Sequence, residues 1–127
     1  MQERRQHKRF EKVLPLKLAG GENDILTETK NISVSGAYCS IDKPLELMTK
    51  LNVVLLIPVK KNKTNTVKKV NCEGVIVRRE YIRDNGAGLY YVGIFFSDIA
   101  PKDKKILEKY IDSAEKAQKP VFDSKHN

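Results

Sequence analysis

The sequence predicts an all-β fold, a barrel or a sandwich, with a single helix at its C-terminal end. Six short runs of apolar or alternating residues are separated by turn-forming residues, and only the last segment changes to helical spacing. The chain has 127 residues, of which 40% are hydrophobic and 31% are charged. This is enough apolar material for one core, and the length makes a second independent core unexpected.

The first three predicted strands follow from alternation and from the turns between them. Leu14, Leu16 and Leu18 lie on one side of the first strand. Residues 20–24 and 33–36 carry the glycine, asparagine and serine residues that favour turns. The strands are therefore predicted at residues 10–18, 25–32 and 37–41.

The next three strands are bounded by a proline and by two turn signals. Residues 51–59 are the most apolar run of the chain, and Pro58 places the end of that run at a sheet edge or a strand end. Residues 60–66 are basic and polar, which predicts a hairpin loop, and the Asn-Gly pair within residues 83–88 favours a tight reversal. The remaining strands are predicted at residues 67–80 and 89–96.

Helical periodicity is found only at the C-terminal end. Ile106, Leu107 and Tyr110 begin a series with three- and four-residue spacing, which predicts an amphipathic helix. Pro101 suits the first helical position, and Pro120 is expected to end the helix. We therefore divide this single domain into a flexible basic arm at 1–9, a β-barrel or sandwich at 10–97, a helix at 101–119 and a tail at 120–127.

The charge of the chain favours anionic partners. Lys and Arg number 24 against 16 Asp and Glu, which leaves a formal net charge of +8. Such a field attracts nucleotides, nucleic acids or acidic membranes, and charge alone does not choose among them. No window approaches 18 consecutive apolar residues, and no apolar segment follows the basic N-terminus. The sequence therefore predicts a cytoplasmic protein without membrane insertion or a secretory signal.

The residues that commonly carry metal or catalytic chemistry are few. Cys39 and Cys72 lie 33 residues apart in apolar strand-like runs, which favours buried thiols over a disulfide or a metal pair. His7 and His126 lie in polar terminal segments, so no metal site is expected. No nucleophile elbow, Cys–His pair or phosphate-binding loop motif is found, so the sequence predicts a protein that is not an enzyme.

The predicted first hairpin brings two polar segments together. If Ala19 faces Ile25 across the turn, antiparallel pairing places Arg9 near Ser35. The basic arm and residues 31–36 would then meet at one end of the hairpin. Arginine binds phosphate oxygens with two parallel hydrogen bonds, while amides and hydroxyls recognise the edge of a base. This combination predicts a site for a ligand that carries phosphate and a polar base.

The same two segments match a specific pair of motifs. Residues 5–9 (RQHKR) fit the pattern RxxxR, and residues 31–36 (NISVSG) fit the pattern [D/N]xSxxG. With both motifs in this order on a six-strand pattern, the sequence resembles the PilZ domain family, whose members are bacterial receptors for the second messenger cyclic di-GMP. Residues 91–96 (YVGIFF) are also similar to the last barrel strand of that family.

The resemblance implies a six-stranded antiparallel PilZ-like β-barrel with a C-terminal amphipathic α-helix. It also implies a non-enzymatic receptor and effector whose N-terminal arm wraps cyclic di-GMP, with no other cofactor and no metal. Since no second domain is predicted, the signal would leave through the barrel surface or the helix to a downstream protein. The residues implied to hold the ligand are Arg5, Arg9, Asn31, Ser33 and Gly36.

Several other residues are candidate contacts on chemical grounds. Ser35 lies within the second motif, and Arg78, Arg79 and Gly93 lie on predicted barrel strands. Arg4 adds a third guanidinium to the arm, which favours a stacked pair of ligands with four phosphate charges over one ligand with two. The alternative that Arg4 touches nothing stays open.

A rival interpretation is a small β-barrel that binds RNA or single-stranded DNA. The net charge fits this class, but its members spread basic residues along a sheet with interleaved aromatic side chains. Here the arginines of the first motif lie on an arm that has no aromatic residue before Phe10. We therefore expect no DNA or RNA ligand, and we expect the lysines of residues 60–69 only to keep a hairpin soluble.

Overall fold

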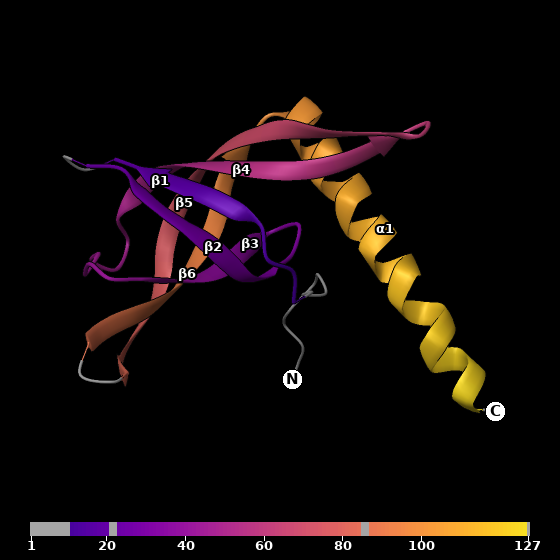
Figure 1. Ribbon diagram of the computed structural model, residues 1–127. Helices are drawn as coiled ribbons and strands as arrows, with labels where there is room; N and C mark the ends of the chain where they lie inside the picture. Colours follow the sequence, from indigo (N-terminus) through magenta and orange to yellow (C-terminus); the bar gives the residue numbers. More distant parts are fainter. Residues whose placement is uncertain (1–10, 21–22, 85–86, 127) are drawn as a thin grey trace.

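The computed structural model describes residues 11–20, 23–84 and 87–126 and contains a closed barrel of six antiparallel strands with one helix (Figure 1). The strands follow one another around the barrel in the order β1-β2-β3-β6-β5-β4, and β4 pairs with β1 to close it. The predicted all-β barrel with a C-terminal helix is confirmed. The elements are β1 Pro15–Ala19, β2 Ile25–Ile32, β3 Gly36–Ile41, β4 Lys50–Lys61, β5 Thr64–Asp84, β6 Ala87–Ile99 and α1 Pro101–His126.

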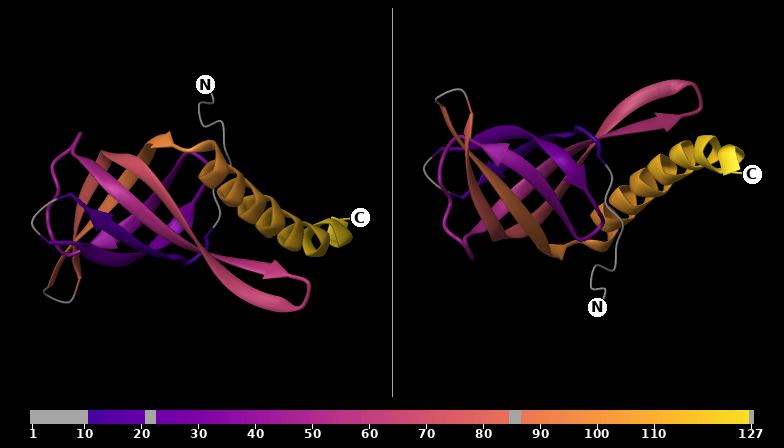
Figure 2. Two further views of the ribbon diagram at one scale, coloured as in Figure 1. Left: turned by 90° about the horizontal axis from the view of Figure 1, so that it is seen from above. Right: turned by 90° about the horizontal axis from the view of Figure 1, so that it is seen from below.

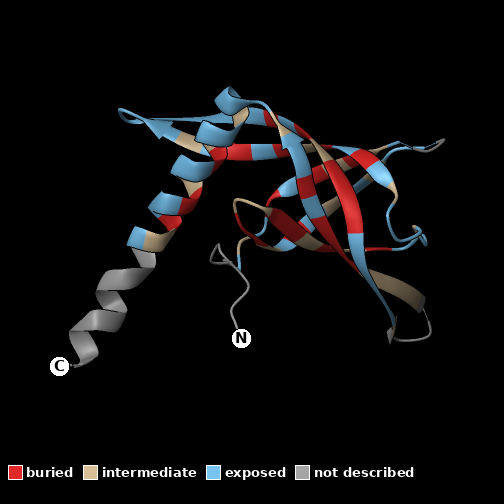
Figure 3. Cartoon of the chain, turned by 180° about the vertical axis from the view of Figure 1, so that it is seen from behind, coloured by how far each residue is buried: buried red, intermediate tan, exposed pale blue. Residues whose placement is uncertain are grey.

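The core fills the barrel and continues under the helix (Figure 3). Strand residues alternate between the interior and the outer surface, as the two-residue period of a strand requires. From α1, Leu107, Ile111 and Ala114 are buried at helical spacing. The interior strand residues that are fully buried and largest are Leu18, Ile32, Leu55, Ile57, Ile76 and Ile94.

The register of the first hairpin differs by one residue from the prediction. Leu18, and not Ala19, faces Ile25, and Leu16 faces Thr27. Residues that face each other share one side of a sheet, so the predicted register would have placed Glu28 on the same side as the buried leucines. The observed register keeps that carboxylate outside and buries the small Thr29 instead.

The last two hairpins are longer than predicted. The loop expected at residues 60–66 is a two-residue turn, because Lys61 pairs with Thr64. Asn62 occupies the left-handed region there with φ of 59°, a conformation that asparagine tolerates. At the other end, β5 reaches Asp84 and β6 begins at Ala87, while residues 85–86 lie outside the described part of the chain. The polar composition of these residues therefore predicted loops, whereas many of them form strands that project from the barrel.

Pro58 lies inside β4, in the segment where only β5 pairs with it. The prediction of an edge position is confirmed, because a proline lacks the N–H that a second neighbour would need.

Helix α1 begins at Pro101 as predicted and continues past Pro120, where the sequence predicted its end (Figure 2). A proline removes one backbone donor from a helix without forbidding its continuation, so it marks a boundary only as a tendency. Among the described residues, no helix has the length and apolar character needed to cross a membrane.

The two cysteines are free and buried, as predicted. Burial raises the pKa of the Cys39 thiol to about 12. The pKa of Cys72 is also raised to about 12, mainly by burial and further by the charge of Asp103 on α1. Neither thiol is poised for nucleophilic chemistry, since the thiolate is the reactive form.

Candidate functional site

A row of side chains crosses four strands on the outer surface of the barrel. Asn31 on β2 faces Tyr38 on β3, Tyr38 faces Gly93 on β6, and Gly93 faces Arg78 on β5. These four residues line one groove of about 370 Å³ together with Ser35 and Phe95. We call this surface the binding face. Four of the residues that line it were predicted from the sequence: Asn31, Ser35, Arg78 and Gly93. The first and the last of them are 62 positions apart in the chain.

Two β-bulges turn the polar residues of this row outward. On β2 the register shifts between Thr29 and Asn31, so that Thr29 and Ile32 both point inward while Asn31 lies on the outer side. On β5 the register shifts between Ile76 and Arg78, and both Val77 and Arg78 are exposed while Ile76 is buried. An extra residue in one strand re-aims the side chains beside it, which is a common device next to binding sites.

The motif loop, residues 31–36, is fixed by its own hydrogen bonds. Ser33 is fully buried at 0% exposure. Its backbone N–H donates to the carbonyl of Gly36 at 2.8 Å, and its hydroxyl accepts from the N–H of Ser35 at 3.2 Å. The hydroxyls of Ser33 and Ser35 lie 3.2 Å apart. Ser33 therefore positions the loop from inside, while Ser35 reaches the groove.

Gly36 makes the closest approach in the loop. A Cβ atom at this position would collide with the backbone carbonyl oxygen of Ile94 on β6. The Phe96 N–H also donates to the Ser35 carbonyl at 2.9 Å, so the loop lies directly against β6. The predicted role of Gly36, a close backbone approach that a side chain would block, agrees with this geometry.

An aromatic and charged cluster borders the row. The rings of Tyr38 and Tyr91 meet edge to face with centroids 5.7 Å apart, and the Lys30 ammonium lies 5.4 Å from the Tyr91 centroid. The Tyr38 hydroxyl donates to Glu80 at 3.4 Å. Burial raises the pKa of Tyr38, and the neighbouring charge of Glu80 raises it further. Sequence reasoning missed Tyr38 and Lys30. Alternation of Tyr38 with the buried Ala37 and Cys39 was the signal that could have identified it.

The two candidate arginines of β5 lie on opposite sides of the strand. Arg78 lines the groove, and among the described residues its guanidinium forms no ion pair. Arg79 donates from Nη1 to the Leu45 carbonyl at 3.2 Å and lies 5.9 Å from the Tyr90 ring centroid. Successive side chains of a strand point to opposite faces, so only Arg78 belongs to the binding face.

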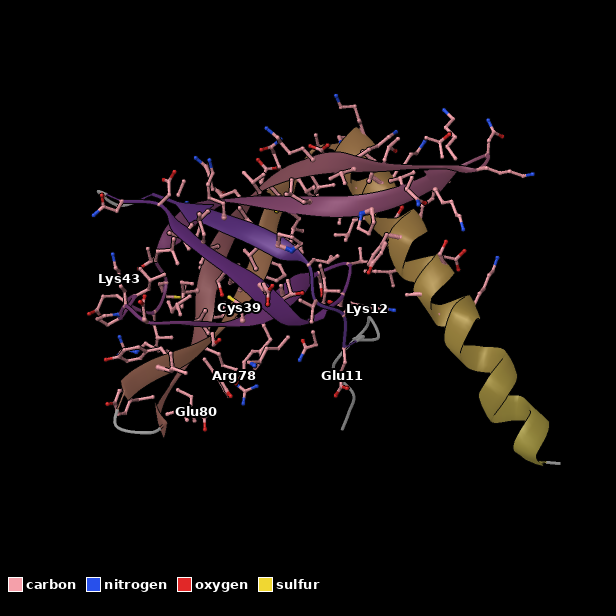
Figure 4. All side chains as sticks on the ribbon, viewed as in Figure 1. Glu11, Lys12, Cys39, Lys43, Arg78 and Glu80 are labelled. Atoms are coloured by element: carbon pink, nitrogen blue, oxygen red, sulfur yellow. The ribbon has the colours of Figure 1, made fainter. Side chains whose placement is uncertain are left out.

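The chain enters the barrel next to this face. The Leu14 N–H donates to the Thr29 hydroxyl at 3.0 Å, and that hydroxyl donates to the Lys12 carbonyl at 2.5 Å. Glu11 lines a shallow depression with Lys30, and Figure 4 shows Glu11, Arg78 and Glu80 below the barrel in the same view. Arg4, Arg5 and Arg9 lie outside the described residues, so their predicted place near Ser35 stays a prediction.

Within residues 11–20, 23–84 and 87–126, no three His, Cys, Asp or Glu side chains lie close enough to hold a metal ion. The side chains of the binding face and its border offer groups for noncovalent recognition. Guanidinium and ammonium groups can bind phosphate, an amide and hydroxyls offer directional hydrogen bonds, and tyrosine rings offer surfaces for stacking.

Comparison with known proteins identifies a family and a fold. The family model described as PilZ domain matches residues 3–113, a range that includes both motifs and all six strands. No curated protein matches the sequence.

The fold is similar to several solved structures. The Bacillus subtilis inhibitor of motility MotI/DgrA has a TM-score of 0.74 and 20% identity over 92% of this chain and 54% of that one. The PilZ domain with c-di-GMP of YcgR from Escherichia coli has a TM-score of 0.63 and 12% identity over 95% of this chain and 98% of that one. The K. pneumonia MrkH–c-di-GMP complex has a TM-score of 0.68 and 19% identity over 91% of this chain and 55% of that one. The chain thus spans about half the length of MotI/DgrA and of MrkH.

Proposed function

Because this chain belongs to the PilZ domain family, we propose that it is a non-enzymatic receptor for cyclic di-GMP. The observation that carries the proposal is the groove on the binding face, which gathers Asn31, Ser35, Arg78 and Gly93. Glu11, which follows the basic arm in the sequence, lies beside the neighbouring Lys30. The similar structures of the YcgR PilZ domain and of MrkH with c-di-GMP support the same ligand.

The groups of the binding face suit the parts of such a ligand. Arg78 and Lys30 supply positive charge for phosphate, and an arginine can hold two phosphate oxygens at once. Asn31 and the Ser35 hydroxyl offer the donors and acceptors that a guanine edge requires. Gly93 lets Arg78 and Tyr38 lie close over the floor of the groove, since a Cβ atom at this position would be 3.1 Å from the Cβ of Arg78.

The arm is proposed to complete the site. A groove of about 370 Å³ is at the small end of the range for ligand pockets, so the binding face alone covers only part of a dinucleotide. Arg5 and Arg9 would hold the phosphates and a guanine edge. Asn31 would contact the ligand from the motif loop, and the buried Ser33 would act by holding that loop in place. We expect cyclic di-GMP to slow trypsin cleavage after Arg4, Arg5 and Arg9.

Val34 offers a route for the signal from the motif loop to the helix. It packs against the core from the middle of the loop. A second groove, of about 480 Å³, is lined by Val34 on one side and by Ile111, Glu108 and Asp112 of α1 on the other. Ligand contacts with the loop would change this groove, and α1 would present the change to a downstream protein. A receptor that signals through such a change of its surface needs no catalytic group.

Titration calorimetry of the full chain with cyclic di-GMP tests the receptor assignment. GTP and a single-stranded oligonucleotide serve as competitors. We expect cyclic di-GMP to bind, and we expect neither competitor to displace it. Displacement by the oligonucleotide would support the rival single-stranded nucleic-acid barrel instead.

The same titration tests the proposed role of Arg4. If its guanidinium compensates the charge of a stacked pair, the wild type should bind two ligands per chain and Arg4→Leu one. One ligand per wild-type chain would remove this role and leave the receptor proposal standing.

A further inference from the structure

The β4–β5 hairpin projects from the barrel as a two-stranded ribbon whose base packs beside α1 (Figures 1 and 2). The two strands pair without a register shift out to Lys61 and Thr64. However, β1 leaves β4 after Leu55, and β6 joins β5 only at Cys72. Residues 56–69, which we call the lysine ribbon, therefore have no third strand. At about 3.4 Å per residue, six residues on each strand extend about 20 Å.

The lysine ribbon carries charge of one sign only. Its lysines are Lys60, Lys61, Lys63, Lys68 and Lys69, and no Asp or Glu occurs between residues 51 and 72. All five lysines are exposed. Among the described residues, none of them forms an ion pair.

The lysines occupy both faces of the ribbon. Facing residues share a side, so Lys68 lies on the side of Ile57, and Lys61 lies on that same side four residues further along β4. Lys69 faces Leu56 and Lys60 faces Asn65, which places these two lysines on the opposite side. A flat charged surface would engage one of these sides, whereas a groove with phosphates on both walls would engage both.

Helix α1 adds to the positive charge on one side of the ribbon. A groove of about 560 Å³ lies between the two elements, and four lysines line it: Lys60, Lys61, Lys68 and Lys109. Asp112 is the acidic residue of its lining, and its carboxylate is 3.6 Å from the Lys116 ammonium. The groove therefore keeps an excess of positive charge.

Two simpler explanations fit less well. Lysines protect free strand edges from aggregation, but charge of either sign would serve that purpose, and here only one sign occurs. An anionic membrane would also attract the lysines, but a ribbon that enters the lipid interface needs apolar residues at its tip. Residues 60–65 are Lys-Lys-Asn-Lys-Thr-Asn.

We propose that the lysine ribbon binds the phosphate backbone of double-stranded DNA. The major groove, about 12 Å wide, admits a two-stranded β-ribbon, and the phosphates that flank it would meet lysines on both faces. Lysine acts as a point charge without the paired geometry of arginine, so binding should be largely independent of base sequence and strongly dependent on salt. This revises two predictions, that no DNA is bound and that the lysines only keep the hairpin soluble, and it is independent of the proposed cyclic di-GMP site.

The test is fluorescence anisotropy of the full chain with a short labelled DNA duplex of mixed sequence over a range of salt concentrations. The slope of log K against log salt is about −0.9 for each phosphate contact. In the variant with Lys61→Gln and Lys63→Gln, we expect the slope to become less negative by about 2 and the affinity at low salt to fall at least tenfold.

A matched control keeps the net charge of that variant. Lys43→Gln with Lys50→Gln removes two lysines away from the ribbon tip: Figure 4 labels Lys43 at the opposite end of the barrel, and Lys50 begins β4. We expect this control to retain the wild-type slope. Equal losses in both variants, or no duplex binding by the wild type, would overturn the proposal. Ribbon-dependent binding to phosphatidylserine-containing vesicles but not to the duplex would overturn it in favour of a membrane.

Discussion

The binding face and the lysine ribbon are both positively charged, yet they are built in opposite ways. The binding face spans four adjacent strands of the closed barrel, and two bulges and a glycine set the direction of its polar groups. The ribbon has free edges, a regular register and lysines on both faces. The first arrangement suits one ligand of defined shape, and the second suits a polyanion of repeating charge. Charge alone therefore says little about the partner until the backbone that carries it is known.

The two buried thiols report on the rigidity of the two regions. Cys39 lies beneath the binding face on β3, and Cys72 lies on β5 at the base of the ribbon. With the pKa of each raised to about 12, the thiolate fraction at mildly alkaline pH should be lower by on the order of a thousandfold than in the unfolded chain. We expect correspondingly slow reaction with a thiol reagent, and Cys72 should react first. Prior labelling of Cys39 would mean that the binding face opens more readily than the ribbon base.

Substitution of Gly36 should show how rigid the motif loop is. Gly36→Ala should lower the free energy of unfolding by about 1–3 kcal/mol, because the new Cβ meets a backbone carbonyl that has no side-chain freedom to move away. Thr66→Ala in the ribbon removes an exposed hydroxyl and should change stability by less than about 0.5 kcal/mol. Urea denaturation measures both. A cost for Gly36→Ala as small as that for Thr66→Ala would contradict the close approach.

The two neighbouring arginines of β5 offer a matched pair for the binding face. Arg78→Gln should weaken cyclic di-GMP binding about tenfold, since a charge-assisted hydrogen bond contributes about 1.5–3 kcal/mol. Arg79→Gln should change the affinity by less than about threefold, because its guanidinium bonds to Leu45 on the other side of the strand. The lysine-ribbon variant should behave like Arg79→Gln in this assay. Equal effects of Arg78→Gln and Arg79→Gln would remove the groove from the site.

The smallest expected effect concerns the ionisation of Tyr38. Burial and the charge of Glu80 raise its pKa, so the protonated phenol is favoured by folding. The corresponding stability is complete below the ordinary pKa of tyrosine and is lost as the pH rises through the folded-state value. Glu80→Gln should shift the Tyr38 titration to lower pH, as followed by NMR of the ring. An unchanged titration would mean that Glu80 does not restrain Tyr38.

Local sequence signals predicted the interior of the fold well. The bounds predicted for β2, residues 25–32, are those observed, because its threonines and terminal isoleucines fit a half-buried strand. The helix start at Pro101 was also correct. The register of β1 was wrong by one residue, although the carboxylate of Glu28 would have argued against the chosen pairing.

The binding face was harder to predict than the core. Gly36 and Asn31 could be identified from the motif, but Tyr38 and Arg78 reach them only through pairings across β3, β6 and β5. The bulge before Arg78 has no clear sequence signal, so nothing local separated Arg78 from Arg79. The extension of the ribbon was missed for a related reason. Residues 60–66 have the composition of a loop, and the pairing of β4 with β5 continues through them up to Lys61 and Thr64.

The central claim is that the arm and the binding face together hold cyclic di-GMP, and calorimetry of Arg9→Ala beside the wild type tests it most directly. Loss of a bidentate, charge-assisted contact should weaken binding by about a hundredfold or more, with the thermal unfolding midpoint unchanged. Lys43→Ala, which removes one positive charge from the loop before β4, should leave the affinity nearly unchanged. If Arg9→Ala reduces binding less than about fivefold, the arm is not part of the site and the account of this protein as a PilZ-type receptor that closes its arm over the ligand is wrong.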